Sequence, residues 1–221
     1  RGDAIRLWSS HDNQLLSNKI YKSRDFVLWY SSGNNIENNY GSYNRYSLHF
    51  MHAGRNMVRN NFFEYNSVGI FFMYSSGTIA IGNTVKNSLG AFGVGIGMKD
   101  SSNFTLLENN LIYNPRGLYL DQSPYHPRTV NIFERNNILY NSSGIQFQVS
   151  RERSIFKDNI IKGNIEPVVS DTPRNNLSIN DWNGNYWDMY EGFDRNKDGY
   201  GDIPYKHYVY ADKLWLYNPN V

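Results

Sequence analysis

Apolar residues recur along this chain in pairs that are separated by one residue, and the pairs recur at a nearly fixed interval. The first members of seven successive pairs are Ile5, Phe26, Leu48, Ile70, Ile96, Leu118 and Ile145. The second members lie two residues later, so both series advance by 21, 22, 22, 26, 22 and 27 residues. Alternation over a few residues is typical of strands, and no helical stripe of apolar residues accompanies it. We therefore expect short strands arranged in a sequence repeat.

Two further positions recur in each repeat. An Asn precedes a second short strand, at Asn18, Asn39, Asn61, Asn83, Asn110, Asn137, Asn159 and Asn185. A third apolar position lies near Leu15, Ile36, Met57, Ile79, Leu106, Ile132 and Ile155. In the irregular second copy, Tyr40 rather than Gly41 is the expected core residue. Three strands per repeat cannot bury their own apolar residues, so the repeats must stack. This predicts an all-β fold, a right-handed parallel β-helix of about seven to eight coils.

The repeat also predicts the organisation of the chain. Residues 1–185 are expected to form β-helix coils, and 186–221 an irregular C-terminal cap over the exposed sheet edge. Since the chain begins directly at a strand, we expect further coils to precede it in a longer protein. The two long repeats carry insertions at 91–93 and 123–128, and such insertions form loops on one flank of a solenoid.

The composition adds a structural role for Asn, which occurs 31 times. At a coil corner, Asn tolerates the left-handed backbone conformation, and its amide can bond to the Asn above and below. The net charge of +2 without a basic stripe argues against nucleic acid as a partner. The absence of Cys excludes disulfides and thiolate metal sites.

One segment near the C-terminus has the spacing of a calcium-binding loop. Oxygen-bearing residues alternate and Gly199 follows at the sixth position, which suits a hard cation. The predicted calcium ligands are Asp194, Asn196, Asp198, Tyr200 (through its carbonyl) and Asp202. The twelfth position is Tyr205 instead of Glu, so a weak site is expected.

Stacking the coils also predicts a surface stripe. If the second members of the apolar pairs point inward, the residues after them point outward, and these are Trp8, Trp29, Met51 and Met73. His49 and His52 lie beside them. Thioether and imidazole groups suit Cu(I), and exposed apolar patches mark interfaces. Three interpretations stay open: a stripe covered by another segment, a partner interface, or a transient Cu(I) contact through Met51, Met73, His49 and His52. His126, in the second insertion, is a further candidate for partner binding.

Motifs for catalysis are sparse. The sequence contains no P-loop, nucleophile elbow or zinc-protease motif. Lys99, Asp100 and Asp121 fall on adjacent coils and could carry acid–base chemistry on a polysaccharide, as in a lyase or epimerase. This carbohydrate-active protein is the alternative function, and a surface-layer or adhesion repeat is a third.

The C-terminal segment carries a resemblance to a known family. Residues 185–205 read N-Y-W-D-M-Y-E-G-F-D-R-N-K-D-G-Y-G-D-I-P-Y. This resembles the closing segment of the NosD family, whose pattern is N-x-W-x-x-Y-x-G-x-D-x-(D/N)-x-D-G-x-G-D-x-P-Y. Every fixed position is met, and the Asn-rich coils resemble the repeats of the same family.

The resemblance implies a non-enzymatic periplasmic protein that assists copper-site assembly in nitrous oxide reductase. It implies as partners the ATPase and membrane subunits of an ABC transporter, a copper chaperone lipoprotein and the apo reductase. The location implied is the periplasm, peripheral to the inner membrane through the transporter. No motif transfers copper ligands to this chain, so the stripe residues rest on the stacking argument.

Overall fold

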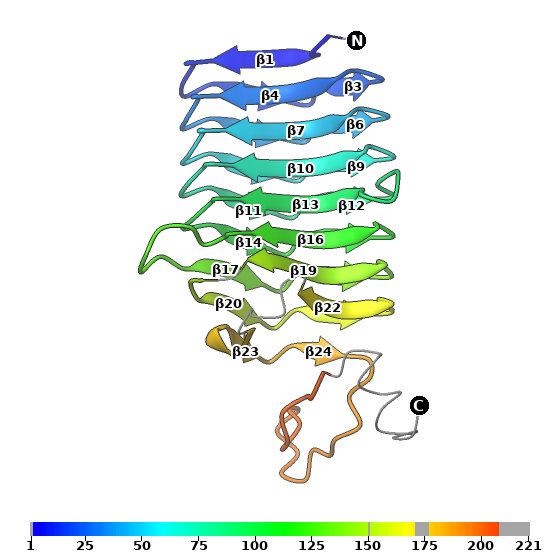
Figure 1. Ribbon diagram of the computed structural model, residues 1–221. Coiled ribbons are helices and arrows are strands. Elements are labelled where there is room, and N and C mark those ends of the chain that lie inside the picture. The colour runs from blue at the N-terminus through cyan, green and yellow to red at the C-terminus, as the bar shows by residue number, and fades with distance from the viewer. Residues whose placement is uncertain (1, 150, 171–176, 208–221) are drawn as a thin grey trace.

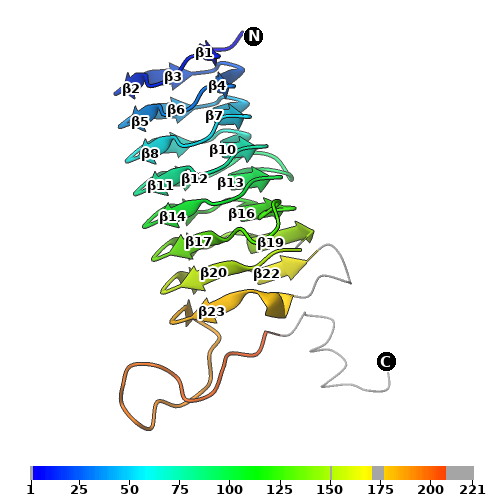
Figure 2. The same cartoon turned by 90° about the vertical axis from the view of Figure 1, so that its left-hand side faces the viewer.

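The computed structural model describes residues 2–149, 151–170 and 177–207. Three parallel sheets of eight strands each run the length of a rod, and every coil contributes one strand to each sheet (Figures 1 and 2). The only helical element in the described part is the short 3-10 helix η1 (Leu177–Ile179). The right-handed parallel β-helix predicted from the repeat is therefore confirmed, with about eight coils.

The strands follow the predicted order of three per coil. Sheet A contains β1 (Ile5–Trp8), β4 (Asp25–Trp29), β7 (Tyr46–Met51), β10 (Val68–Met73), β13 (Val94–Lys99), β16 (Arg116–Asp121), β19 (Ser143–Val149) and β22 (Glu166–Ser170). Sheet B contains β2 (Gln14–Leu16), β5 (Asn35–Glu37), β8 (Met57–Arg59), β11 (Ile79–Ile81), β14 (Thr105–Leu107), β17 (Asn131–Glu134), β20 (Ser154–Lys157) and β23 (Asp181–Asn183). Sheet C contains β3 (Lys19–Tyr21), β6 (Tyr40–Ser42), β9 (Phe62–Glu64), β12 (Thr84–Lys86), β15 (Asn110–Ile112), β18 (Asn137–Leu139), β21 (Ile160–Lys162) and β24 (Tyr186–Trp187).

Sheet A follows the predicted register. Ile5 pairs with Phe26, and Ile70 with Leu48 and Ile96. Both members of each apolar pair point inward, and the Phe rings of successive coils stack, as at Phe50 and Phe72 with centroids 4.8 Å apart. Burial of these side chains supplies the stabilisation that a single coil lacks.

Sheet B corrects the predicted core positions by one residue in four coils. The expected positions near Met57, Ile79, Ile132 and Ile155 are replaced in the core by their C-terminal neighbours, Val58, Ala80, Phe133 and Phe156. Adjacent apolar residues fit the pattern equally well, and a shift of one residue exchanges the two faces of a strand. The hydrogen-bonded register, not hydrophobicity, decides between them.

Sheet C contains a second correction. Gly41, not Tyr40, faces the core, where a Cβ atom at Gly41 would lie 2.6 Å from the hydroxyl of Ser47. Tyr40 points outward, where it stacks on Phe62 with centroids 5.9 Å apart and meets the tilted ring of Tyr21 at 5.4 Å. Crowding inside this coil therefore leaves no room for a larger side chain.

A continuous ladder of Asn side chains runs along one corner of the rod. In each step the amide nitrogen and the backbone N–H of one Asn donate to the amide oxygen of the next. The members are Asn18, Asn39, Asn61, Asn83, Asn109, Asn136, Asn159 and Asn185. The predicted members Asn110 and Asn137 were wrong by one residue and form outward positions of β15 and β18. The predicted hydrogen-bonding role of the Asn series is confirmed.

The left-handed corner conformation belongs to a different residue than predicted. The residue before each ladder Asn has the positive φ, for example Glu108 at 56° and Arg135 at 51°. The chain turns at that residue, and the following Asn then points its amide inward. The Asn ladder is therefore a hydrogen-bonding device, and the backbone strain of the corner lies one residue earlier.

Both predicted insertions border sheet A. The first precedes β13, and the second follows β16 and projects from the rod as a loop (Figure 1). Below the last coil, Trp182 stacks on Phe156 at 4.2 Å, and Trp187 stacks on Tyr205 at 4.7 Å. These rings lie at the end of the core. Residues 208–221 of the expected cap lie outside the described residues, and the cap over 186–221 stays a prediction.

Candidate functional site

The predicted stripe lies on the outer face of sheet A. Trp8 pairs with Trp29, Trp29 with Met51, and Met51 with Met73, so the four side chains stand one above another. Trp8 is 53% exposed, and the other three are partly exposed. Lys99 and Asp121 continue the same column in the next two coils. The stripe therefore has an aromatic end, a thioether centre and a charged end.

The aromatic end is held by rings and one guanidinium. The rings of Trp8 and Trp29 lie 5.2 Å apart, and Tyr30 meets Trp8 edge-on at 5.5 Å. The guanidinium of Arg6 lies 5.3 Å from the ring of Trp8 and 5.8 Å from that of Trp29. Large rings restrained in this way present apolar area to a partner with little loss of side-chain entropy.

His49 lies next to the thioether centre. His49 is only 7% exposed, and its Nε2 is 3.2 Å from the sulfur of Met73. Tyr46 stacks on the imidazole at 4.5 Å, and Phe71 packs against its edge. A soft thioether and an imidazole nitrogen at this separation are suitable donors for Cu(I).

Behind His49 lies an acidic residue that the sequence reasoning missed. Asp25 is buried in β4, and its Oδ2 is 3.9 Å from Nδ1 of His49. Arg45 binds both oxygens of the same carboxylate. Burial by itself would raise the pKa of Asp25, but its interactions with His49 and Arg45 outweigh burial and lower the pKa to about 2. Asp25 is therefore ionised at neutral pH. A lone Asp opening an apolar strand was the available signal.

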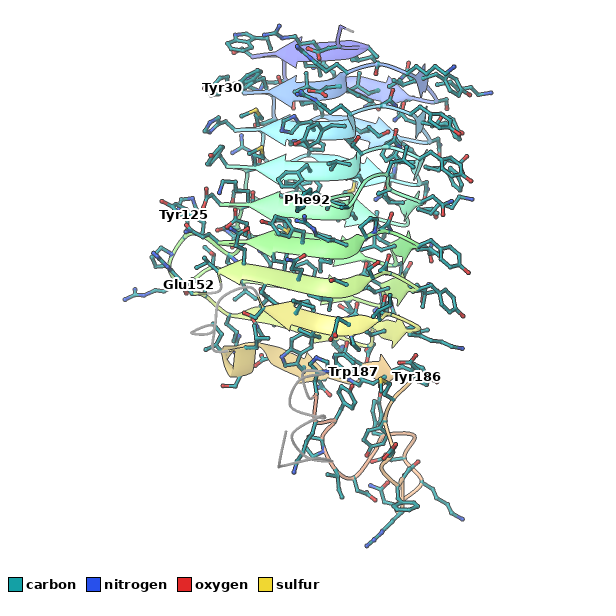
Figure 3. The ribbon with its side chains drawn as sticks, turned by 45° about the vertical axis from the view of Figure 1, so that its right-hand side comes forward. Tyr30, Phe92, Tyr125, Glu152, Tyr186 and Trp187 are labelled. Atoms are coloured by element: carbon teal, nitrogen blue, oxygen red, sulfur yellow. The ribbon has the colours of Figure 1, made fainter. Side chains whose placement is uncertain are left out.

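His52 and His126 lie apart from this cluster. His52 occupies the corner next to the stripe, where its ring is stacked between Tyr30 and Tyr74 at 5.1 and 4.9 Å. His126 lies in the loop after β16 with its ring against Tyr125, and its backbone N–H donates to Ser102. Figure 3 labels Tyr30 and Tyr125 on this flank. Of the predicted residues, the structure thus brings together His49, Met51 and Met73.

The predicted charged cluster is present at the other end of the stripe. Lys99 lies 2.8 Å from Asp121 and 3.8 Å from Asp100. The hydrogen bond to Asp121 raises the pKa of the Lys99 ammonium, so Lys99 stays protonated at neutral pH. A paired ammonium of this kind cannot serve as a catalytic base.

The predicted calcium loop forms a compact hydrogen-bonded turn. The carboxylate of Asp194 accepts the backbone N–H of Asp198 and Gly199, and the carboxylate of Asp202 accepts that of Arg195. The side chains of Asn196 and Asp198 bond to each other. Across the part of the chain that the structure describes, no group of three or more His, Cys, Asp or Glu is placed to hold a metal ion. The geometry therefore gives the calcium prediction no support.

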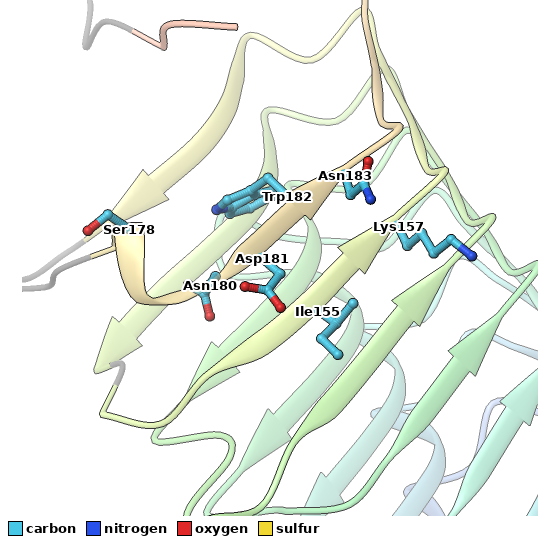
Figure 4. A pocket seen from close by; sticks show the side chains of 7 residues that line it. All are labelled: Ile155, Lys157, Ser178, Asn180, Asp181, Trp182 and Asn183. Atoms are coloured by element: carbon cyan, nitrogen blue, oxygen red, sulfur yellow. The ribbon is translucent and has the colours of Figure 1, made fainter. Parts of the chain in front are cut away.

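One surface hollow borders the predicted calcium loop and is lined by Phe193, Arg195, Asn196, Asp202 and Ile203. Another depression lies at the last coil of sheet B (Figure 4), lined by Ile155, Lys157, Ser178, Asn180, Asp181, Trp182 and Asn183. It contains none of the predicted site residues. No helix among the described residues is long and apolar enough to cross a membrane.

Comparison with known proteins gives a family match. The model of the family described as "Periplasmic copper-binding protein (NosD)" matches residues 1–192. Two proteins named "Probable ABC transporter binding protein NosD" are similar over 88 residues, or 39% of this chain. The one from Stutzerimonas stutzeri is 38% identical and the one from Pseudomonas aeruginosa 34% identical. The match covers 20% and 21% of their lengths, so the chain spans about a fifth of these relatives.

A solved structure shares the fold. The crystal structure of the periplasmic alginate epimerase AlgG superposes with a TM-score of 0.63 at 17% identity, covering 81% of this chain and 46% of that one. At this identity the likeness concerns the β-helix alone.

Proposed function

Because the chain belongs to the NosD family of periplasmic copper-binding proteins, we propose that it is a scaffold for copper-site assembly in nitrous oxide reductase. The observation that carries the proposal is the stripe of Trp8, Trp29, Met51 and Met73, with the nitrogen of His49 at the sulfur of Met73. It joins an apolar contact surface to soft metal donors. A copper-delivering partner requires both.

The proposed course of events has two parts. A copper chaperone lipoprotein docks on the aromatic end of the stripe, and Cu(I) is then contacted by Met51, Met73 and His49, with His52 at the rim. The apo reductase later takes the place of the chaperone on the same face. Copper is cargo in this scheme, and the donors fit it because thioethers and imidazole prefer soft ions.

The remaining partners follow from the family. Relatives are named as binding proteins of an ABC transporter, and we propose that this protein associates with the ATPase and membrane subunits of such a transporter at the inner membrane. We propose that His126, in the loop after β16 with its ring against Tyr125, contacts a partner on that face.

A non-enzymatic role suits the site better than the carbohydrate-active alternative. The shared fold with an alginate epimerase does not transfer an activity at 17% identity. The only cluster proposed for acid–base catalysis is Lys99 with Asp100 and Asp121, and the Lys99 ammonium forms ion pairs with both carboxylates. Incubation with anionic polysaccharides should therefore give no unsaturated product and no epimerised residue, and either product would favour the enzyme.

Docking on the aromatic end is tested by a double variant. Trp8→Ala/Trp29→Ala should weaken binding of the copper chaperone by about 30-fold or more, because truncated aromatic anchors typically cost about 2 kcal/mol or more. The measurement is calorimetry with copper-free chaperone. The matched control is Tyr43→Ala/Tyr65→Ala, which removes a stacked, exposed aromatic pair from a different corner. Equal affinity of the Trp variant and the parent would contradict docking at the stripe.

Calcium in the loop of residues 194–202 stays a prediction with its own test. At a Ca²⁺ concentration about a hundredfold above Kd, a weak calcium site would add about 2.7 kcal/mol to the free energy of unfolding and would raise Tm by several degrees. Asp198→Asn should abolish this shift, whereas Asp181→Asn, outside the loop, should preserve it. An unchanged Tm of the parent in Ca²⁺ and in EDTA would remove calcium from the account.

A further inference from the structure

The two nitrogens of the His49 ring lie in different surroundings. Nε2 is 3.2 Å from the thioether of Met73, on the side of the stripe. Nδ1 is on the inner side, buried, with the carboxylate of Asp25 at 3.9 Å and no hydrogen-bond partner among the described residues. A neutral imidazole carries one proton, so one nitrogen donates and the other presents a lone pair. Which nitrogen has the proton decides whether His49 can bind a metal.

The acceptors facing the two nitrogens are unequal. A carboxylate is a strong, charged acceptor of N–H, whereas a thioether is a weak one. The proton is therefore drawn to Nδ1, and the lone pair of Nε2 is left facing the sulfur. In metal sites, histidine ligands are oriented in this way by a carboxylate on the nitrogen that does not bind the metal.

We infer that Asp25 is the positioning residue of a monovalent soft-metal site formed by His49 Nε2 and the thioethers of Met73 and Met51. This inference rests on the proposed function and adds to it the residue that prepares the site and the reason for a preference for monovalent over divalent ions. Asp25 touches no metal itself. It acts by holding His49 in the tautomer that leaves Nε2 free.

Arg45 sets the charge preference. It binds both oxygens of Asp25, so the buried acidic group behind His49 is already neutralised. The remaining donors, one imidazole and two thioethers, are uncharged. A partly buried site without net negative charge stabilises a divalent ion poorly, because the cost of burying an ion rises steeply with its charge. Cu(I) and Ag(I) should therefore bind, and Zn(II) should not.

The imidazole is also prevented from turning. Tyr46 covers one face of the ring and Phe71 meets its edge. Phe71 in turn occupies the space over Gly97, where a Cβ atom would lie 2.3 Å from the Phe71 ring. A ring flip that would exchange the two nitrogens must displace these neighbours, so the orientation of His49 is fixed before metal arrives.

The test compares two Asp→Asn variants that both disrupt an Asp–Arg pair. In Asp25→Asn, Arg45 keeps the amide oxygen, so the amide NH₂ faces Nδ1 and moves the proton to Nε2. Asp3→Asn alters the equivalent Asp3–Arg24 pair one coil earlier, whose nitrogens and oxygens lie 2.8 and 3.0 Å apart. The probe is Ag(I), titrated in the absence of any partner, with Zn(II) in a parallel titration.

Asp25→Asn should weaken Ag(I) binding about 10- to 100-fold, the usual effect of losing a carboxylate behind a histidine ligand, and Asp3→Asn should change it less than about twofold. Nitrogen NMR of the parent should show His49 protonated at Nδ1, and Asp25→Asn should reverse this. A parent protonated at Nε2, tighter binding of Zn(II) than of Ag(I), or equal Ag(I) affinity in both variants would each overturn the inference.

These results are separable from the proposed function. A chain that binds the chaperone through Trp8 and Trp29 but binds no Ag(I) would contradict the positioning role and leave the docking scaffold in place. A chain that binds Ag(I) as expected but no partner would do the reverse. The NMR measurement uses the parent protein alone, so it tests the inference even if the Asp25→Asn variant misfolds.

Discussion

The double variant Met51→Ala/Met73→Ala is expected to keep its fold. When it replaces the parent protein in a cell that produces nitrous oxide reductase, the copper content of the reductase should fall by about tenfold or more. Both residues are partly exposed in the centre of the stripe, so their truncation costs little buried area, about 1 kcal/mol each. The thioether of Met73 contacts His49, and Met51 is its neighbour in the sheet. Removing both leaves no thioether donor beside His49, and imidazole alone cannot retain Cu(I) against a competing chaperone.

The control for this variant uses the other methionines at the surface. Met57→Ala/Met189→Ala removes two thioethers that lie outside sheet A and are partly or largely exposed. Copper content of the purified reductase and its activity should match the parent in this control. Normal copper loading in the Met51/Met73 variant would show that the stripe does not handle copper.

Asn109→Ala should destabilise the β-helix by about 3 kcal/mol or more. Asn109 donates to Asn136 and to the carbonyl of Ala80, and its amide oxygen accepts the backbone and side-chain N–H of Asn83. Alanine removes the partner of the Ala80 carbonyl, of the Asn83 backbone N–H and of one Asn83 amide hydrogen, while the Asn83 amide keeps its bond to the carbonyl of Val58. Each buried group that loses its partner costs about 1–3 kcal/mol. Because coils are stabilised by their neighbours, the loss in a central coil should spread along the rod.

The adjacent residue provides the matched comparison. Asn110 points outward from β15 and bonds to the hydroxyl of Thr84 and to Asn137 at a partly exposed position. Asn110→Ala should therefore cost less than about 1 kcal/mol. Urea unfolding of both variants measures the difference. Equal destabilisation, or a larger loss at Asn110, would contradict the ladder as the structure has it.

This pair of residues also illustrates how far the sequence reaches. The repeat predicts the β-helix, the inward pairs of sheet A and the vertical alignment of Trp8 with Met73, because these depend on spacing alone. It does not separate Asn109 from Asn110, or Val58 from Met57. Neighbours of the same chemical type satisfy the pattern equally, and only the hydrogen-bonded register between coils distinguishes them.

The candidate site was predictable in part for the same reason. The stripe follows from register, so Met51, Met73 and His49 are found by counting residues. Asp25 is not, because β4 and β7 pair with a register shift between Asp25 and Val27. That irregularity places the carboxylate of one coil beside the imidazole of the next. No periodic argument includes such a shift.

The central claim, that this face receives Cu(I) and a copper-delivering partner, is tested most directly by anaerobic Cu(I) titration with and without the copper chaperone. We predict saturable uptake by the chain alone, lost in Met73→Ala and His49→Ala, and a complex with the chaperone that depends on Trp8 and Trp29. A chain that takes up no Cu(I) and forms no complex with the chaperone would contradict the account.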